Sequence, residues 1–288
     1  MVEEVIEHLQ IKKNHWYIDA TFGRGGHTRK ILEHGGCVIA FDHDQDATEF
    51  AQDEFQGAID QKELIIVNEN FNKLTKSISE RKLTHPISAI LFDFGTSVDQ
   101  LKDINRGFSF EHDTKLDMRM DKRLGIQAKD LLAILSEKQL EDLFRIDGGE
   151  EEARAIAKAI VRQREHSPIE TTVQLRELIA AKKNQKRTHL NPATKVFQAL
   201  RIAVNSEMEN IAEVLPQALD MLEPNGRIIT ISFHEGEDRI VKNQFKEWEH
   251  HNKGQQLTKK PLQPTEEEIH KNPRSRSAKL RVFIKSNL

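Results

Sequence analysis

The sequence has very little cysteine and no long apolar run, and both absences narrow the class of protein. Cys37 is the only cysteine among 288 residues, so an intramolecular disulfide is excluded and a reducing, cytoplasmic setting is expected. No apolar segment approaches the roughly 18 residues that indicate a bilayer span. The first ten residues are acidic and amphipathic, unlike a signal or transit peptide. With 37% hydrophobic and 31% charged residues, the composition is typical of a soluble globular protein.

Two common nucleotide-binding motifs are also missing. No G-x-x-x-x-G-K-[ST] element occurs, which argues against an NTPase of that kind. The G-x-G-x-x-G fingerprint of NAD enzymes fails because Thr28 stands where the third glycine should be. An NAD-dependent oxidoreductase is therefore disfavoured but stays an alternative.

The net charge of −3 offers no overall electrostatic case for nucleic-acid binding. Two stretches are nevertheless basic and lack any acid: one lies between Glu177 and Glu207, and the other follows Glu268. Such runs favour local contacts with phosphate groups, although ordinary solvated surfaces also carry them. Their basic residues are Lys182, Lys183, Lys186, Arg187, Lys195 and Arg201 in the first stretch, and Lys271, Arg274, Arg276, Lys279, Arg281 and Lys285 in the second.

Short apolar segments alternate with helical ones at both ends of the chain. Segments rich in β-branched and aromatic residues predict buried strands at 15–21, 37–42, 63–68 and 87–94. A further strand is predicted at 226–233, after the turn signal Pro224-Asn225-Gly226, and 255–260 and 277–285 are candidates for two closing strands. Helices are predicted at 27–34, 44–55, 72–82 and 238–249. This alternation indicates βαβ crossovers and an α/β fold with a doubly wound sheet of about seven strands.

The middle of the chain contains no convincing strand. Helices are predicted at 125–135, 136–144, 150–164 and from Thr171 onward. Apolar residues then recur in steps of three and four from Phe197 to Leu222, which predicts an amphipathic helix with a break at Pro216. We therefore expect a core domain of residues 1–100 and 192–288, interrupted by a helical domain of residues 101–191.

A glycine turn leads from the first predicted strand into a helix. Gly23, Gly25 and Gly26 permit close approach of backbone N–H groups to a ligand. Asp42 ends the second strand, where a carboxylate can accept hydrogen bonds from both ribose hydroxyls. A glycine turn alone could be structural, but together with Asp42 it favours a nucleoside-containing cofactor. Asp19, before the turn, would repel a pyrophosphate and suits a cationic sulfonium, which favours S-adenosylmethionine.

Two further strand ends carry candidate residues. Phe71 follows the third strand and could stack beside an adenine or simply belong to the core. Asp93 ends the very apolar fourth strand and faces the crevice where ligands of open α/β sheets bind. Because burying an unpaired acid is costly, a functional role for Asp93 is favoured. His234 and Asp117 are further polar candidates, but the residues assign no catalytic base and no metal site.

Five separated motifs resemble those of one family. In order along nearly the whole chain, they are similar to motifs of the RsmH (MraW) family of bacterial 16S rRNA cytosine-N4 methyltransferases. The motifs are YIDATFGRGGHT (17–28), RGFSFEHDTKLDMRMD (106–121), NPATKVFQALRIAVNSE (191–207), ISFHEGEDRIVK (231–242) and NPRSRSAKLRV (272–282).

This resemblance implies a fold, a reaction and a set of contacts. The fold is a class I (Rossmann-like) methyltransferase sheet with an inserted helical domain that recognises the substrate. The methyl donor is S-adenosyl-L-methionine, and the substrate is a cytidine in the decoding region of small-subunit rRNA, free or in the assembled subunit. A homodimer is left open. The implied cofactor contacts are Gly25, Gly26, His27, Asp42, Phe71, Asp93 and Gln100, of which His27 and Gln100 rest mainly on the resemblance.

The chain departs from the family pattern in places. It starts after the H-x-P-V segment of the family, and its loop 96–100 has Val98 and Asp99 where relatives have serine and proline. Because this loop is expected near the substrate, a non-catalytic RNA-binding or ribosome-assembly protein of the same fold stays an alternative. A DNA amino-methyltransferase is disfavoured, since its [SDN]-P-P-[YFW] element is absent and the RGFSF run is present.

Overall fold

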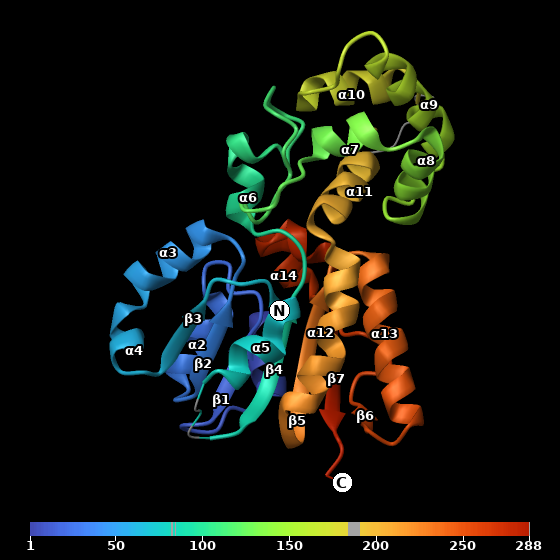
Figure 1. Cartoon of the computed structure of the whole chain (residues 1–288). Coiled ribbons are helices and arrows are strands. Elements are labelled where there is room, and N and C mark those ends of the chain that lie inside the picture. The colour runs from blue at the N-terminus through green and yellow to red at the C-terminus, as the bar shows by residue number, and fades with distance from the viewer. Residues whose placement is uncertain (82, 84, 184–190, 288) are drawn as a thin grey trace. The chain divides into compact units, whose positions relative to one another are not determined.

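The chain folds into two compact units. The computed structural model describes residues 1–81, 83, 85–183 and 191–287 (Figure 1). Residues 1–95 and 208–288 form the first unit, which we call the sheet unit, and residues 96–207 form the second, the helical unit. Within the described residues, no helix combines the length and the apolar character that a membrane span requires.

One sheet of seven strands organises the sheet unit. Its order is β3-β2-β1-β4-β5-β7-β6, with β7 antiparallel to β5 and β6 and the other neighbours parallel. Because β1 lies between β2 and β4, the chain reverses its direction of winding there, and ligands of such sheets bind at this point. The α/β fold with a sheet of about seven strands, predicted from the sequence, is confirmed. The strands are β1 (Trp16–Asp19), β2 (Cys37–Phe41), β3 (Leu64–Val67), β4 (Ile87–Asp93), β5 (Leu222–Ser232), β6 (Gly254–Gln256) and β7 (Lys279–Lys285).

Alternate residues of each central strand enter different cores on the two faces of the sheet. In β4, Ala89 and Leu91 join one cluster, whereas Ile90 and Phe92 join the other. Helices α1 (Val2–Leu9), α2 (Gly26–Glu33) and α3 (Gln45–Glu54) cover the first face, and α5 (Leu74–Ser79), α12 (Glu207–Met221) and α13 (Glu235–His250) cover the second. The remaining short helices are α4 (Gln56–Asp60), η1 (Phe71–Lys73), α14 (Glu266–Lys271) and η3 (Pro273–Ser277).

The helical unit has its own core. Its helices are α6 (Val98–Lys102), η2 (Ile104–Arg106), α7 (Ala128–Ile134), α8 (Glu137–Ile146), α9 (Ala153–Arg164), α10 (Thr172–Ala180) and α11 (Thr194–Asn205). Its core includes Phe144 of α8 and Leu200 of α11, both fully buried. The units meet at 95/96 and 207/208, whereas 100/101 and 191/192 were expected. The second boundary follows α11 because this helix packs against α7 and α8.

The expected break at Pro216 is wrong. Helix α11 ends at Asn205, Ser206 adopts a left-handed conformation with φ 48°, and α12 continues through Pro216. The left-handed residue ends the helix where the chain leaves the helical unit. The apolar periodicity could not reveal this, because it continues across the break.

Candidate functional site

The glycine turn connects β1 to α2 at the carboxyl edge of the sheet. Gly23 and Gly25 have positive φ angles of 56° and 71°. A Cβ on Gly25 would lie 2.6 Å from the ring of Phe55 and 2.7 Å from that of Phe22. A Cβ on Gly26, the first residue of α2, would meet no atom within 4 Å. Gly25 is therefore required by the fold, whereas Gly26 leaves open space beside a helix N-terminus.

Asp19, the last residue of β1, stabilises this turn through hydrogen bonds to residues on both sides of it. Its side chain is fully buried; one carboxylate oxygen accepts the Thr28 hydroxyl at 2.7 Å and the other accepts the Thr21 N–H at 3.3 Å. Burial raises the pKa of Asp19, and the nearby His27 charge and the Thr28 hydrogen bond partly offset this effect. Asp19 therefore holds the turn, and its burial and its two internal hydrogen bonds do not favour the predicted direct contact with a cationic ligand.

Asp42 follows β2 and is fixed by the backbone around it. Its two carboxylate oxygens accept the N–H groups of Gly23 and Asp44, both at 2.9 Å, and its carbonyl accepts the Asn68 amide at 3.1 Å. Burial raises the pKa of Asp42 to about 7, against the opposing effect of the two N–H groups. Asp42 therefore joins the glycine turn to the end of β2.

His27 and Asp93 form a pair at the same edge. The His27 Nε2 atom lies 3.6 Å from Asp93 Oδ2, and Thr21 Oγ1 accepts the Asp93 backbone N–H at 2.7 Å. Burial alone would lower the pKa of His27, but the carboxylates of Asp93 and Asp19 outweigh it and raise that pKa. Among the described residues, the buried atoms His27 Nδ1 and Asp93 Oδ1 have no hydrogen-bond partner. The sequence motifs did not reveal this pairing, because the two residues are far apart along the chain.

Phe71 begins η1 after β3. It packs against Phe92 and Phe94, with ring centroids 5.9 Å and 6.0 Å away, and it stays partly exposed. The preceding Asn70 caps this turn through the N–H of Asn72 at 3.0 Å and donates to His43 Nδ1 at 3.2 Å. Phe71 therefore packs in the core, and its exposed part lies at the end of β3. Its predicted contact with an adenine stays a prediction.

Gln100 belongs to the helical unit, whereas the other six predicted contacts belong to the sheet unit. Its side-chain oxygen accepts the Ser97 N–H at 3.0 Å, and the Ser97 hydroxyl accepts the Gln100 N–H at 3.1 Å. These two bonds form a capping box at the start of α6. Ser97 and Gln100 thus order the loop in which Val98 and Asp99 depart from the family pattern.

Comparison with known proteins decides the family. The sequence model of the MraW methylase family matches residues 1–286. This chain belongs to the MraW methylase family. The Ribosomal RNA small subunit methyltransferase H of Caldicellulosiruptor saccharolyticus is 42% identical over 306 residues, covering 99% of this chain and 97% of the relative. The protein of the same name from Desulfotalea psychrophila is 43% identical over 291 residues, covering 99% and 96%.

Among solved structures, an rRNA methylase from Streptococcus thermophilus covers 99% of this chain and 93% of its own, with 11% identity and a TM-score of 0.47. That similarity is too low to support an inference about function. The family membership, by contrast, confirms the prediction that the chain is a methyltransferase.

In this MraW methylase, charged residues of the RGFSF and LDMRMD motifs form hydrogen bonds within the helical unit. Arg106 is 5% exposed and donates to the Met120 carbonyl at 2.9 Å. Arg119 binds both carboxylate oxygens of Asp117, at 2.7 and 2.8 Å, and Gln127 donates to the same carboxylate at 3.0 Å. Arg106 and Arg119 therefore bind groups within the helical unit, and Asp117 has a structural role.

Most of the basic residues in the two runs are also engaged. Lys183 pairs with the buried Glu150 at 2.5 Å and donates to the Pro192 carbonyl at 2.6 Å. Arg281 pairs with Asp238 at 2.6 Å in the core of the sheet unit. Lys186 and Arg187 lie outside the described residues. The exposed cations that stay candidates for phosphate contact are Lys182, Arg274 and Arg276.

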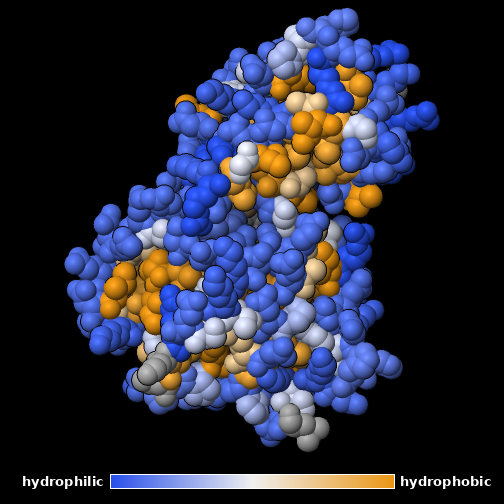
Figure 2. Space-filling model, in the orientation of Figure 1, coloured by the Kyte–Doolittle hydropathy of each residue, from blue (hydrophilic) through white to orange (hydrophobic). Residues whose placement is uncertain are grey.

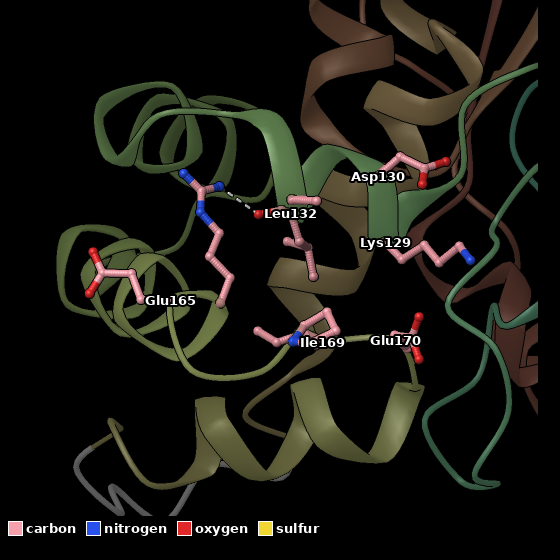
Figure 3. Close-up of a pocket in the computed structure, with 9 residues that line it drawn as sticks. Lys129, Asp130, Leu132, Glu165, Ile169 and Glu170 are labelled. Carbon is pink, nitrogen blue, oxygen red and sulfur yellow. Dashed lines mark hydrogen bonds between the residues drawn. The ribbon is translucent and has the colours of Figure 1, made fainter.

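The helical unit contains a cavity of about 350 Å³ between α7 and the segment after α9 (Figure 3). Leu132 and Ile169 supply apolar walls, while Lys129, Asp130 and Glu170 supply charges at the rim. The Arg164 guanidinium donates to the Leu132 carbonyl at 2.6 Å. Apolar side chains also reach the surface of this unit (Figure 2), where Ile134 and Ile146 are each 66% exposed.

Proposed function

We propose that this MraW methylase transfers a methyl group from S-adenosyl-L-methionine to the N4 amine of a cytidine in small-subunit (16S) rRNA. The relatives that match almost end to end carry the name Ribosomal RNA small subunit methyltransferase H. The structural observation that carries the proposal is the pair of unsatisfied buried atoms on His27 and Asp93, beside a glycine turn and the Asp42 carboxylate.

The polar atoms at this edge fit the cofactor. Asp42 would accept the ribose hydroxyls, Gly26 leaves room for close backbone approach, and Phe71 would pack beside the adenine. The amino-acid end of the cofactor carries both an ammonium and a carboxylate group. It would satisfy the two orphaned atoms, because Asp93 Oδ1 can accept from the ammonium and protonated His27 Nδ1 can donate to the carboxylate.

The reaction places two demands on the protein. When bound, the cofactor supplies an electrophilic methyl group on a positively charged sulfur. The cytosine N4 lone pair is delocalised into the ring, so the protein must hold the amine in line and provide an acceptor for the proton that it sheds. Asp93 is one acceptor candidate at the ligand-binding edge: when Oδ1 accepts from the ammonium, its second oxygen, Oδ2, which lies 3.6 Å from His27 Nε2, would take the proton.

Substrate recognition is assigned to the helical domain predicted from the sequence. Residues 101–191 would bind the RNA, and residues 1–100 and 192–288 would bind the cofactor. The cavity beside α7 and the exposed Lys182 support this assignment, and Arg274 and Arg276 add two exposed cations on the sheet unit. Action on ribosomal subunits would take place in the cytoplasm.

The raised pKa of Asp42 makes cofactor binding depend on pH. Ribose hydroxyls donate best to the ionised carboxylate, but the ligand-free protein keeps this group protonated below about pH 7. Binding must then release a proton, so the affinity for S-adenosylhomocysteine should fall by about tenfold for each pH unit below about 7. Calorimetry from pH 5.5 to 8.5 measures this slope. The Asp42→Asn variant should bind S-adenosylhomocysteine weakly, and its affinity should change less with pH. A slope equal to that of the wild type would show that Asp42 does not cause the pH dependence.

The proposed reaction is tested by methyl transfer from labelled S-adenosylmethionine. We expect transfer to under-modified small ribosomal subunits or to their RNA, and none to DNA. Label in DNA would favour a DNA amino-methyltransferase, since that class modifies the same exocyclic amine. Cofactor binding without transfer to any substrate would favour a non-catalytic RNA-binding or ribosome-assembly protein.

A further inference from the structure

Phe233 stands beside Asp93 at the ligand-binding edge. It is the first residue after β5, whose Ile231 is the register partner of Asp93 in β4. Ile229 and Ile231 enter the same core cluster as Ala89 and Leu91. Because side chains alternate along a strand, Asp93 and Phe233 continue that one face of the sheet. The two residues therefore emerge on the same side, from neighbouring strands.

The Phe233 backbone is firmly held while its ring is partly open. The Phe233 N–H donates at 2.7 Å to Glu237, whose side chain is fully buried. The ring packs in part against the same core cluster and stays partly exposed. Gly95, which follows β4 with φ 102°, lies under the ring edge, since a Cβ built there would be 3.8 Å from Phe233 Cδ2. The Phe233 ring therefore lies beside Gly95, which has no side chain to cover it.

The spacing between Phe233 and Asp93 suits a nucleobase. Phe233 is two residues beyond the register partner of Asp93, which corresponds to roughly 6.6 Å along the strand and about 4.8 Å across to its neighbour. A base stacked flat on the Phe233 ring could therefore turn its edge toward Asp93.

We propose that Phe233 is the stacking platform for the target cytosine, an inference that rests on the proposed function. A base inside folded RNA must leave its stack to reach such an edge, and an aromatic ring replaces part of the lost stacking. The platform would hold the N4 amine on the side of Asp93. The role concerns the substrate base, whereas Phe71, on another strand end, is assigned to the adenine of the cofactor.

The test compares Phe233→Leu with Phe233→Tyr. Leucine keeps apolar bulk but removes the π-face, so kcat/KM for the RNA should fall by about 5- to 150-fold, while tyrosine should restore most of it. S-adenosylhomocysteine affinity should change by less than about twofold in both variants. The matched control, Phe71→Leu, should show the reverse pattern, with weaker S-adenosylhomocysteine binding as its main defect.

Base extrusion provides a second readout that a merely structural role would not change. The fluorescence of a 2-aminopurine placed next to the target cytidine should rise when wild type or Phe233→Tyr binds the RNA. It should stay low when Phe233→Leu binds. Equal brightening and equal kcat/KM in all three proteins would overturn the stacking role while leaving the methyl transfer intact. A loss of S-adenosylhomocysteine binding in Phe233→Leu would also overturn it. If wild type transfers no methyl group to RNA, the proposed function itself fails.

Discussion

Asp93→Asn should lower methyl transfer to small subunits by about 10²- to 10⁴-fold, the usual contribution of a positioned proton acceptor. The amide keeps the shape of the side chain but can neither accept the shed proton nor balance the ammonium group of the cofactor. Single-turnover transfer measures the defect, and S-adenosylhomocysteine titration separates the loss of binding from the loss of chemistry.

Asp60→Asn provides the matched control for this experiment. Asp60 ends α4 on the exposed surface of the same unit, so its substitution should leave both transfer and binding at wild-type levels. Near-normal transfer by Asp93→Asn would show that the carboxylate has no part in proton removal, and the acceptor would have to lie elsewhere.

Gly25→Ala should unfold the sheet unit far more readily than Gly26→Ala. At Gly25 the positive φ costs an alanine about 1–2 kcal/mol, and a Cβ 2.6 Å from the Phe55 ring adds to that cost. We expect a total loss of about 3 kcal/mol in the free energy of unfolding. At Gly26 the backbone is helical and the space is open, so alanine should be neutral or stabilise by up to about 1 kcal/mol. Denaturant unfolding of the two variants measures the difference.

The same pair of glycines separates folding from binding. If the cofactor approaches the Gly26 backbone, Gly26→Ala should weaken S-adenosylhomocysteine by about tenfold or more although the protein is fully folded. Wild-type affinity in Gly26→Ala would mean that the open space at the start of α2 is not part of the cofactor site.

The central strands β1, β2 and β4 could be predicted from the sequence because they are buried on both faces. Segments such as 37–42 and 87–94 are almost continuously apolar, and the glycine turn marks where the first strand becomes a helix. The break at Ser206 could not be predicted, because a left-handed residue changes the backbone without interrupting the apolar periodicity around it. The second domain boundary lies after α11 because the apolar residues of this helix join the core of the helical unit, which their periodicity alone does not reveal.

Candidate site residues could be predicted where a strand end carries a polar side chain, as at Asp42 and Asp93. What those residues do to one another depends on tertiary contacts. The raised pKa of Asp42 results from burial, and the pairing of His27 with Asp93 brings together residues 66 positions apart, numbers 27 and 93. The count of basic residues was the weakest guide, since Lys183 and Arg281 were candidates for phosphate contact and both form ion pairs within their own unit.

The most direct test of the account is mass spectrometry of the nucleosides from small subunits treated with the enzyme and labelled S-adenosylmethionine. The account predicts that the label appears in N4-methylcytidine from the RNA, and that Asp93→Asn lowers it by at least about 10²-fold over the same reaction time. Label at C5 of cytosine, on ribose or on another base would contradict the assignment of the exocyclic amine as the methyl acceptor.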